Sequence, residues 1–267
     1  MLLLQCGDVP ERRAPRASGS GTGTAGPRTR RRGSARRRDS FTFDLRRSVS
    51  DALEALAAAV RKGDAGAVEV LLDADPALVN ARRPDGSSFV LFAVYCGHPR
   101  LVEVFRERGR SLDLFEATAA GDTPAVRAFL ASDPAAARAV SPDGFPVLGL
   151  AVFFGHTALA DFLLASGADP NAASANAMKV TPLHAATSRG DAAMVKKLLD
   201  RGADPDARQQ SGWTSLHNAA SQGSVEIVRL LRANGADVSA RTDDGKTAAD
   251  LAEERGHAVL AEPLRQV

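Results

Sequence analysis

Hydrophobic positions recur at helical spacing over most of the chain from about residue 51 onward. Met194 and Leu198 lie four residues apart, and Ile227, Leu230 and Leu231 share one predicted helix face. The apolar segments are punctuated by Gly63, Gly97, Gly121, Gly155, Gly190, Gly223 and Gly256. The pattern predicts pairs of short helices joined by glycine turns, in which glycine adopts the left-handed conformation most easily, and followed by loops.

The glycines are regularly spaced, with successive gaps of 34, 24, 34, 35, 33 and 33 residues. A period near 33 indicates a stacked repeat protein. The segment Thr181–Ala186 reads T-P-L-H-A-A, and Thr214–Ala219 reads T-S-L-H-N-A thirty-three residues later. This resembles the ankyrin repeat, whose signature T-P-L-H-x-A is complete in the first copy and has Ser215 in place of Pro in the second.

The resemblance implies an all-α ankyrin-repeat solenoid built of helix-turn-helix-loop units, in which neighbouring units stack to bury a shared core. It also implies that the signature residues are structural. They are Thr181, Pro182, Leu183, His184, Gly190, Thr214, Leu216, His217 and Gly223.

The first half of the repeat region has an internal symmetry of its own. Residues 53–109 shifted by 58 positions give 20 identities in 57 pairs with residues 111–167. A two-repeat unit has therefore been duplicated, in a half that resembles bacterial ankyrin proteins with D-P-A loops. We expect one domain over residues 49–267, with about six repeats and a C-terminal cap. The expected units are 51–84, 85–110, 111–142, 143–178, 179–211, 212–244 and 245–267.

Two departures from the repeat length carry further predictions. The 24-residue gap between Gly97 and Gly121 leaves no room for a hairpin after Gly109, so we expect a direct helix-to-helix turn there. The stretch Asn171–Lys179 is two residues longer than standard. The hairpin before Thr181, called a finger here like its counterparts in the other repeats, should therefore be enlarged.

The first 48 residues differ in composition from the rest. They contain twelve arginines, no lysine and four acids, a net charge of +8 within a chain of net charge +2, which leaves −6 for the remainder. Only seven of the 48 are Leu, Ile, Val or Phe. We therefore expect a disordered basic arm.

The arm leaves several interpretations open. Its clusters Arg30, Arg31, Arg32, Arg36, Arg37 and Arg38 would neutralise nucleic-acid phosphates, although a solvated arm is the simpler interpretation. A transit peptide or translated sequence upstream of the true start also fits the composition.

Nothing in the sequence predicts an enzyme. There is no Walker loop, G-x-S-x-G or H-E-x-x-H motif, and none of the five histidines has a second ligand at metal-binding spacing. The G-x-G-x-x-G at residues 21–26 follows no predicted strand. No apolar stretch is long enough to span a membrane. The protein has only two cysteines, which fits a reducing compartment, and we expect it to be cytoplasmic. We also expect it to be a monomer that binds no cofactor or metal.

The predicted function is non-catalytic binding of a partner protein through a concave groove and the finger tips. The alternative is a nucleic-acid-associated protein that uses the arm for phosphates and the repeats as a docking platform. In ankyrin proteins the positions just before each turn glycine face the groove, and aromatic anchors dominate binding energy. The candidate partner-binding residues are Tyr95, Phe145, Phe153, Phe154, Arg189, Trp213 and Gln222.

Overall fold

The computed structural model describes residues 36–265, with side chains described from residue 49 onward. The described residues form helices joined by turns, and extended backbone pairs only in two isolated bridges, Arg82 with Ser88 and Val140 with Pro146. The helices are α1 (Arg36–Lys62), α2 (Ala65–Ala74), α3 (Phe89–Tyr95), α4 (Leu101–Glu107), α5 (Leu114–Ala120), α6 (Thr123–Ser132), α7 (Val147–Phe153), α8 (Thr157–Ala165), α9 (Pro182–Ser188), α10 (Ala192–Asp200), α11 (Ser215–Ser221), α12 (Val225–Ala233), α13 (Ala248–Glu254) and α14 (Ala258–Arg265).

The described residues also contain three short 3-10 helices. They are η2 (Pro76–Asn80), η3 (Pro134–Arg138) and η4 (Gln210–Gly212). Both D-P-A segments lead into one of them, because the carboxylates of Asp75 and Asp133 accept the backbone N–H two residues on, at 3.0 Å. The described helices confirm the all-α prediction, and none of them is both long and apolar enough to cross a bilayer.

The chain divides into two compact units. The first comprises the residues up to Ala81 together with Phe92–Arg110, and the second comprises Arg82–Leu91 together with Ser111–Val267. Phe92 and Phe105 are fully buried in the first unit. The second unit holds the longer run of repeats and all the matches to the T-P-L-H signature.

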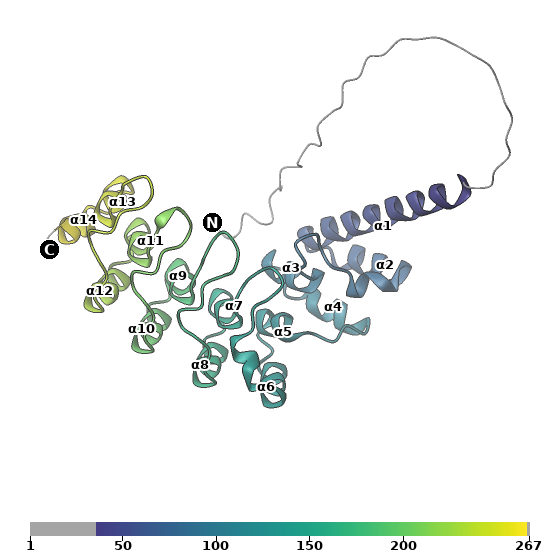
Figure 1. The fold of residues 1–267 in the computed structure, drawn as a ribbon, viewed down its shortest axis with the longest axis horizontal. Helices are drawn as coiled ribbons and strands as arrows, with labels where there is room; N and C mark the ends of the chain where they lie inside the picture. The colour runs from purple at the N-terminus through teal and green to yellow at the C-terminus, as the bar shows by residue number, and fades with distance from the viewer. Residues whose placement is uncertain (1–35, 266–267) are drawn as a thin grey trace, which may run out of the picture. The chain divides into compact units, whose positions relative to one another are not determined.

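In the second unit the helices form two rows. The first helix of each pair (α7, α9, α11 and α13) lies in one row, and the second helices α8, α10 and α12 lie in the other (Figure 1). Large aliphatic side chains of both rows are fully buried between them, including Leu148, Leu163, Leu183, Leu198 and Leu216. Truncating one such leucine to alanine costs about 2–5 kcal/mol.

The predicted glycine turns are confirmed. Each of the seven turn glycines has a positive φ, from 69° at Gly63 to 81° at Gly256. At the first turn of the second unit, the Gly121 N–H donates to carbonyls at the end of α5, and the Asp122 carboxylate then caps α6 by accepting from Ala125 N at 3.0 Å. Glycine is needed here because a side chain in this conformation is strained.

Both predictions from repeat length are also confirmed. Helix α4 ends at Glu107 and α5 begins at Leu114, so no hairpin separates them, and Asp113 and Glu116 form a capping box that starts α5. Most fingers close with a backbone bond between residues four apart, such as Ser141 N to Phe145 O at 2.9 Å. The longer finger closes over six residues, from Ser174 N to Val180 O at 2.9 Å.

The predicted disordered arm, residues 1–48, falls largely outside the described part of the chain. Helix α1 begins at Arg36 and so includes residues 36–48, whereas residues 1–35 lie outside the described part of the chain. A helix from Arg36 fits the sequence, where Phe41, Leu45, Val49 and Leu53 recur every four residues.

Candidate functional site

The signature residues start the first helices. In the copy at Thr181–His184, the threonine hydroxyl lies 2.8 Å from His184 Nδ1, and Thr181 N donates to the same nitrogen at 3.3 Å. The copy at Thr214–His217 repeats this with distances of 2.8 and 3.1 Å. Each pair is a capping box, which satisfies backbone groups that the first helical turn leaves without partners.

The two signature histidines are structural groups. His184 is fully buried and its Nε2 donates to the carbonyl of Trp213 in the next finger at 3.3 Å. His217 Nε2 likewise lies 3.0 Å from Ala240 O. Burial lowers the pKa of His184 from 6.5 to about 4 against the opposing effect of its backbone bonds, and burial also lowers the pKa of His217. Across the described residues, no three His, Cys, Asp or Glu side chains gather in a way that would hold a metal ion.

A second set of side chains joins neighbouring repeats at the opposite ends of the first helices. In each case the donor is a side chain directly before or after the turn glycine of one repeat. It bonds to a backbone carbonyl of the preceding repeat, two residues before the turn glycine there. The bonds are His98 to Arg61 O (3.2 Å), His156 to Ala119 O (2.8 Å), Arg189 to Phe153 O (3.0 Å) and Gln222 to Ser188 O (3.3 Å). The first lies within the first unit and the others lie within the second.

These bonds give a structural role to two of the candidate partner-binding residues. Arg189 and Gln222 are exposed, but each uses one donor to cap the end of the preceding first helix. Sequence reasoning missed this role. The sequence does contain a pattern that indicates this role. His98 and His156 directly follow a turn glycine, whereas the repeats of Arg189 and Gln222 lack such a histidine and have these long polar residues directly before the turn glycine.

The structure separates the predicted aromatic anchors. Phe145 was expected to be an exposed anchor, but its side chain is only 7% exposed. It lies at the foot of its finger, where its N–H donates to Ser141 Oγ at 2.9 Å. Tyr95 belongs to the first unit. Trp213 is partly exposed beside His217, with ring centroids 6.2 Å apart, at the beginning of its first helix. It therefore does not share the site of Phe153 and Phe154, which lie at the end of theirs.

Phe153 and Phe154 form one aromatic pair at the end of α7. Their rings meet edge to face, with centroids 5.0 Å apart and planes at 77°. Both are partly exposed, but Phe153 also packs against the buried core of the second unit. The Phe154 ring lies 6.4 Å from that of His156. Arg189 crosses the same turn, since its guanidinium occupies the place of a side chain on Gly155. We call Phe153, Phe154, His156 and Arg189 the turn surface.

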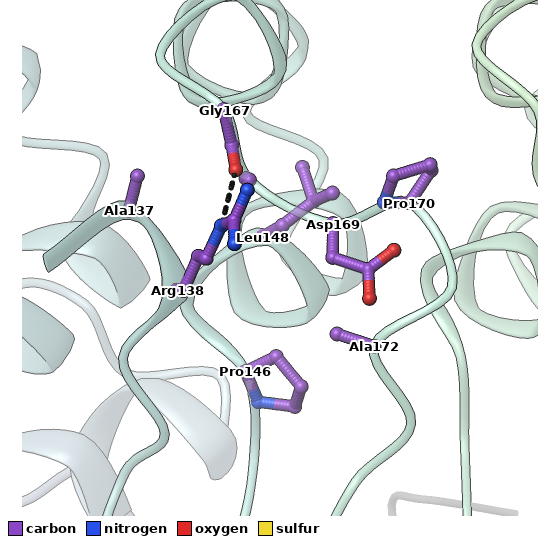
Figure 2. A pocket seen from close by; sticks show the side chains of 9 residues that line it. Ala137, Arg138, Pro146, Leu148, Gly167, Asp169, Pro170 and Ala172 are labelled. Carbon is purple, nitrogen blue, oxygen red and sulfur yellow. Dashed lines mark hydrogen bonds between the residues drawn. The ribbon is translucent and has the colours of Figure 1, made fainter. Parts of the chain in front are cut away.

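A cavity of about 470 Å³ lies elsewhere in the second unit, where the loop after α8 passes over the start of α7 (Figure 2). Ala137, Pro146, Leu148, Pro170 and Ala172 line much of it. Its two charged side chains are Arg138, which donates to Gly167 O at 3.0 Å, and Asp169, whose carboxylate accepts from Asn171 N at 2.8 Å. The lining offers no paired acid and base or activated nucleophile for catalysis.

Comparison with known proteins agrees with this architecture. A family model of ankyrin repeats, which describes three copies in tandem, matches residues 114–209 and again residues 183–265, more than half of the chain. The E3 ubiquitin-protein ligase KEG of Arabidopsis thaliana is 26% identical over 170 residues, which are 60% of this chain and 10% of that protein. The chain thus spans about a tenth of the length of that relative. With its paired helices, glycine turns, capping boxes and fingers, the chain belongs to the ankyrin repeat family.

Proposed function

We propose that this protein is a non-catalytic binding module that holds a partner protein against the exposed ends of its first helices and its finger tips. The observation that carries the proposal is Phe154, which is partly exposed at the end of α7 and is not among the rings packed against the core. A ring held edge-on by a neighbour is pre-organised, so little conformational entropy is lost when a partner covers it.

The features around Phe154 support binding rather than chemistry. The cavity in the second unit lacks a catalytic constellation, and the buried histidines are committed to capping first helices. We assign no ligase activity to this chain, since the similarity to the plant ligase covers a tenth of that protein.

The test is affinity capture from nuclease-treated lysate with the full chain, its Phe154→Ala variant and its Val225→Ala variant. Val225 is the matched control, because it is 58% exposed on α12 in the other row of helices. A partner retained by the wild type and by the Val225 variant, but lost with Phe154→Ala, supports the proposal. Equal retention of every partner by all three proteins would show that Phe154 does not contribute to binding and would exclude the turn surface as the binding site.

The alternative assigns binding to the arginine-rich arm and nucleic acid. Its motivation is the net charge of +8 in residues 1–48. Because α1 begins at Arg36, the deletion that tests it removes residues 1–35 and leaves the helix intact. Salt-sensitive retention on DNA that disappears with this deletion would favour the alternative.

A further inference from the structure

The turn surface has a charge bias that the overall composition conceals. Its ionisable side chains are His156 and Arg189, and the two fingers beside α9 and α11 add Lys179 and Arg208. Among the described residues, no ion pair engages Arg189 or Lys179, and Arg208 is bonded to a backbone carbonyl, that of Arg241. Exposed cations of the same repeats also lie on the second helices, as Arg229 does on α12, so the bias is a local property of the turn surface and the two fingers.

The acids of the same repeats lie elsewhere or are already engaged. Asp161 pairs with Lys197, and Asp200 pairs with Lys196, both on second helices. Asp191 caps α10 by accepting from Met194 N, and Asp204 accepts from Asp206 N in the loop after α10. On the flanking fingers, Asp143 accepts a bond from Ser141, and Asp243 lies close to Arg208 beside Gly212. Among the described residues, none of these carboxylates forms an ion pair with Arg189.

Arg189 retains most of its hydrogen-bonding capacity at this position. Its Nη1 donates to Phe153 O at 3.0 Å, which holds the guanidinium across the end of α7 beside the aromatic pair. A guanidinium has five N–H donors in a planar fork, and carboxylates match that fork with two parallel bonds. An apolar ring and a fixed, unneutralised cation thus stand next to each other.

We propose that the turn surface binds an acidic segment of a partner protein, in which Asp or Glu lies within a few residues of an aromatic or large aliphatic side chain. The apolar side chain packs on Phe154 while the carboxylate accepts bonds from Arg189. This specifies the partner class for the proposed function and rests on it. A nucleic acid is disfavoured as the occupant, because its row of phosphates is matched by several cations, whereas Arg189 is the one guanidinium on the turn surface.

Arg189→Gln is the decisive variant. Gln222 occupies the equivalent position of the next repeat and donates to Ser188 O at 3.3 Å, so glutamine is able to keep the cap while removing the charge. Arg229→Gln is the matched control, since Arg229 is exposed on α12 in the second row. A purely structural role for Arg189 would leave partner binding unchanged in both variants.

The probe is a phage-displayed library of random dodecapeptides, selected on the full chain and counter-selected on the Phe154→Ala variant. Enriched peptides are synthesised and titrated by calorimetry. We expect acidic residues beside aromatic or aliphatic ones, affinity about tenfold weaker for Arg189→Gln, and no change for Arg229→Gln. Raising the salt concentration should weaken binding to the wild type more than to Arg189→Gln.

The other outcomes separate the two proposals. Peptides that depend on Phe154 but lack acids, or that bind Arg189→Gln as tightly as the wild type, would overturn the acidic partner class and leave the binding function standing. No enrichment over Phe154→Ala would count against both. A duplex DNA oligonucleotide whose binding depends on Arg189 would show that the occupant is a nucleic acid instead.

Discussion

The imidazole Nε2 of His156 donates a 2.8 Å hydrogen bond to the carbonyl of Ala119, one repeat earlier in the chain. To make this bond the ring lies across the preceding glycine turn, where a Cβ on Gly121 would approach it to 2.7 Å. Glycine is therefore required at this turn for two reasons, a left-handed backbone and the space that the next repeat's donor fills.

Replacing turn glycines should accordingly have unequal effects. Gly121→Ala and Gly190→Ala place alanine at similar φ values of 76° and 71°, but nothing lies within 4 Å of a Cβ at Gly190. The strain of left-handed alanine costs both variants about 1–2 kcal/mol. Gly121→Ala should lose about 1 kcal/mol more, because His156 must move and its bond is broken. Urea unfolding measures the difference, and equal losses would show that His156 adds nothing to the requirement.

The two rings of the aromatic pair should respond differently to truncation. Phe153→Ala is expected to lower the free energy of unfolding by about 2 kcal/mol or more, since Phe153 packs against the core. Phe154→Ala should lower it by less than about 1 kcal/mol, because its ring is partly exposed and meets Phe153 edge to face. Thermal and urea unfolding test this directly. A large loss with Phe154→Ala would identify both rings as core and remove the anchor from the proposed surface.

Stability should fall on mild acidification. The pKa of His184 is about 4 in the folded chain, against 6.5 ordinarily, so between these values the unfolded chain takes up a proton that the folded chain refuses. The free energy of unfolding should therefore be maximal above pH 6.5 and decline to a loss of about 3 kcal/mol from this group near pH 4. His217 acts in the same direction.

The control for this pH dependence is His184→Gln, because glutamine at the third helical position also completes a capping box but does not titrate. This variant is expected to be less stable at neutral pH and to have a shallower pH dependence between 6.5 and 4. An unchanged slope in urea titrations would assign the acid sensitivity to other groups.

Ser215→Pro should stabilise the protein. Ser215 stands where the preceding signature has Pro182, at the first helical position, and its buried hydroxyl has no hydrogen-bond partner among the described residues. Thr214 before it is already extended, with φ −97° and ψ 170°, as the residue before a proline must be. We expect a gain of about 0.4–1 kcal/mol by urea unfolding. A destabilised variant would mean that the Ser215 N–H or side chain contributes more than its surroundings indicate.

Much of the repeat architecture followed from local pattern. The glycine period, the T-P-L-H copies and the two deviations in spacing predicted helix pairs, a missing finger after Gly109 and a finger two residues longer before Thr181. These features depend on interactions within one repeat or with its immediate neighbour, which periodicity and turn chemistry record directly. The start of α1 at Arg36 fits the four-residue spacing of Phe41 and Leu45, which the average composition of the first 48 residues conceals.

The sequence by itself determined the fold class, the order of the repeats and the residues that start and stop each helix, since all of these depend on contacts close along the chain. Only the tertiary structure decided which candidate anchors are exposed and which of them lie together. It buried Phe145, separated Trp213 from Phe153 and Phe154, and placed Arg189 across the end of the preceding repeat. The physical reason is that exposure and charge pairing depend on which side chains neighbouring repeats present to one another once the stack has formed.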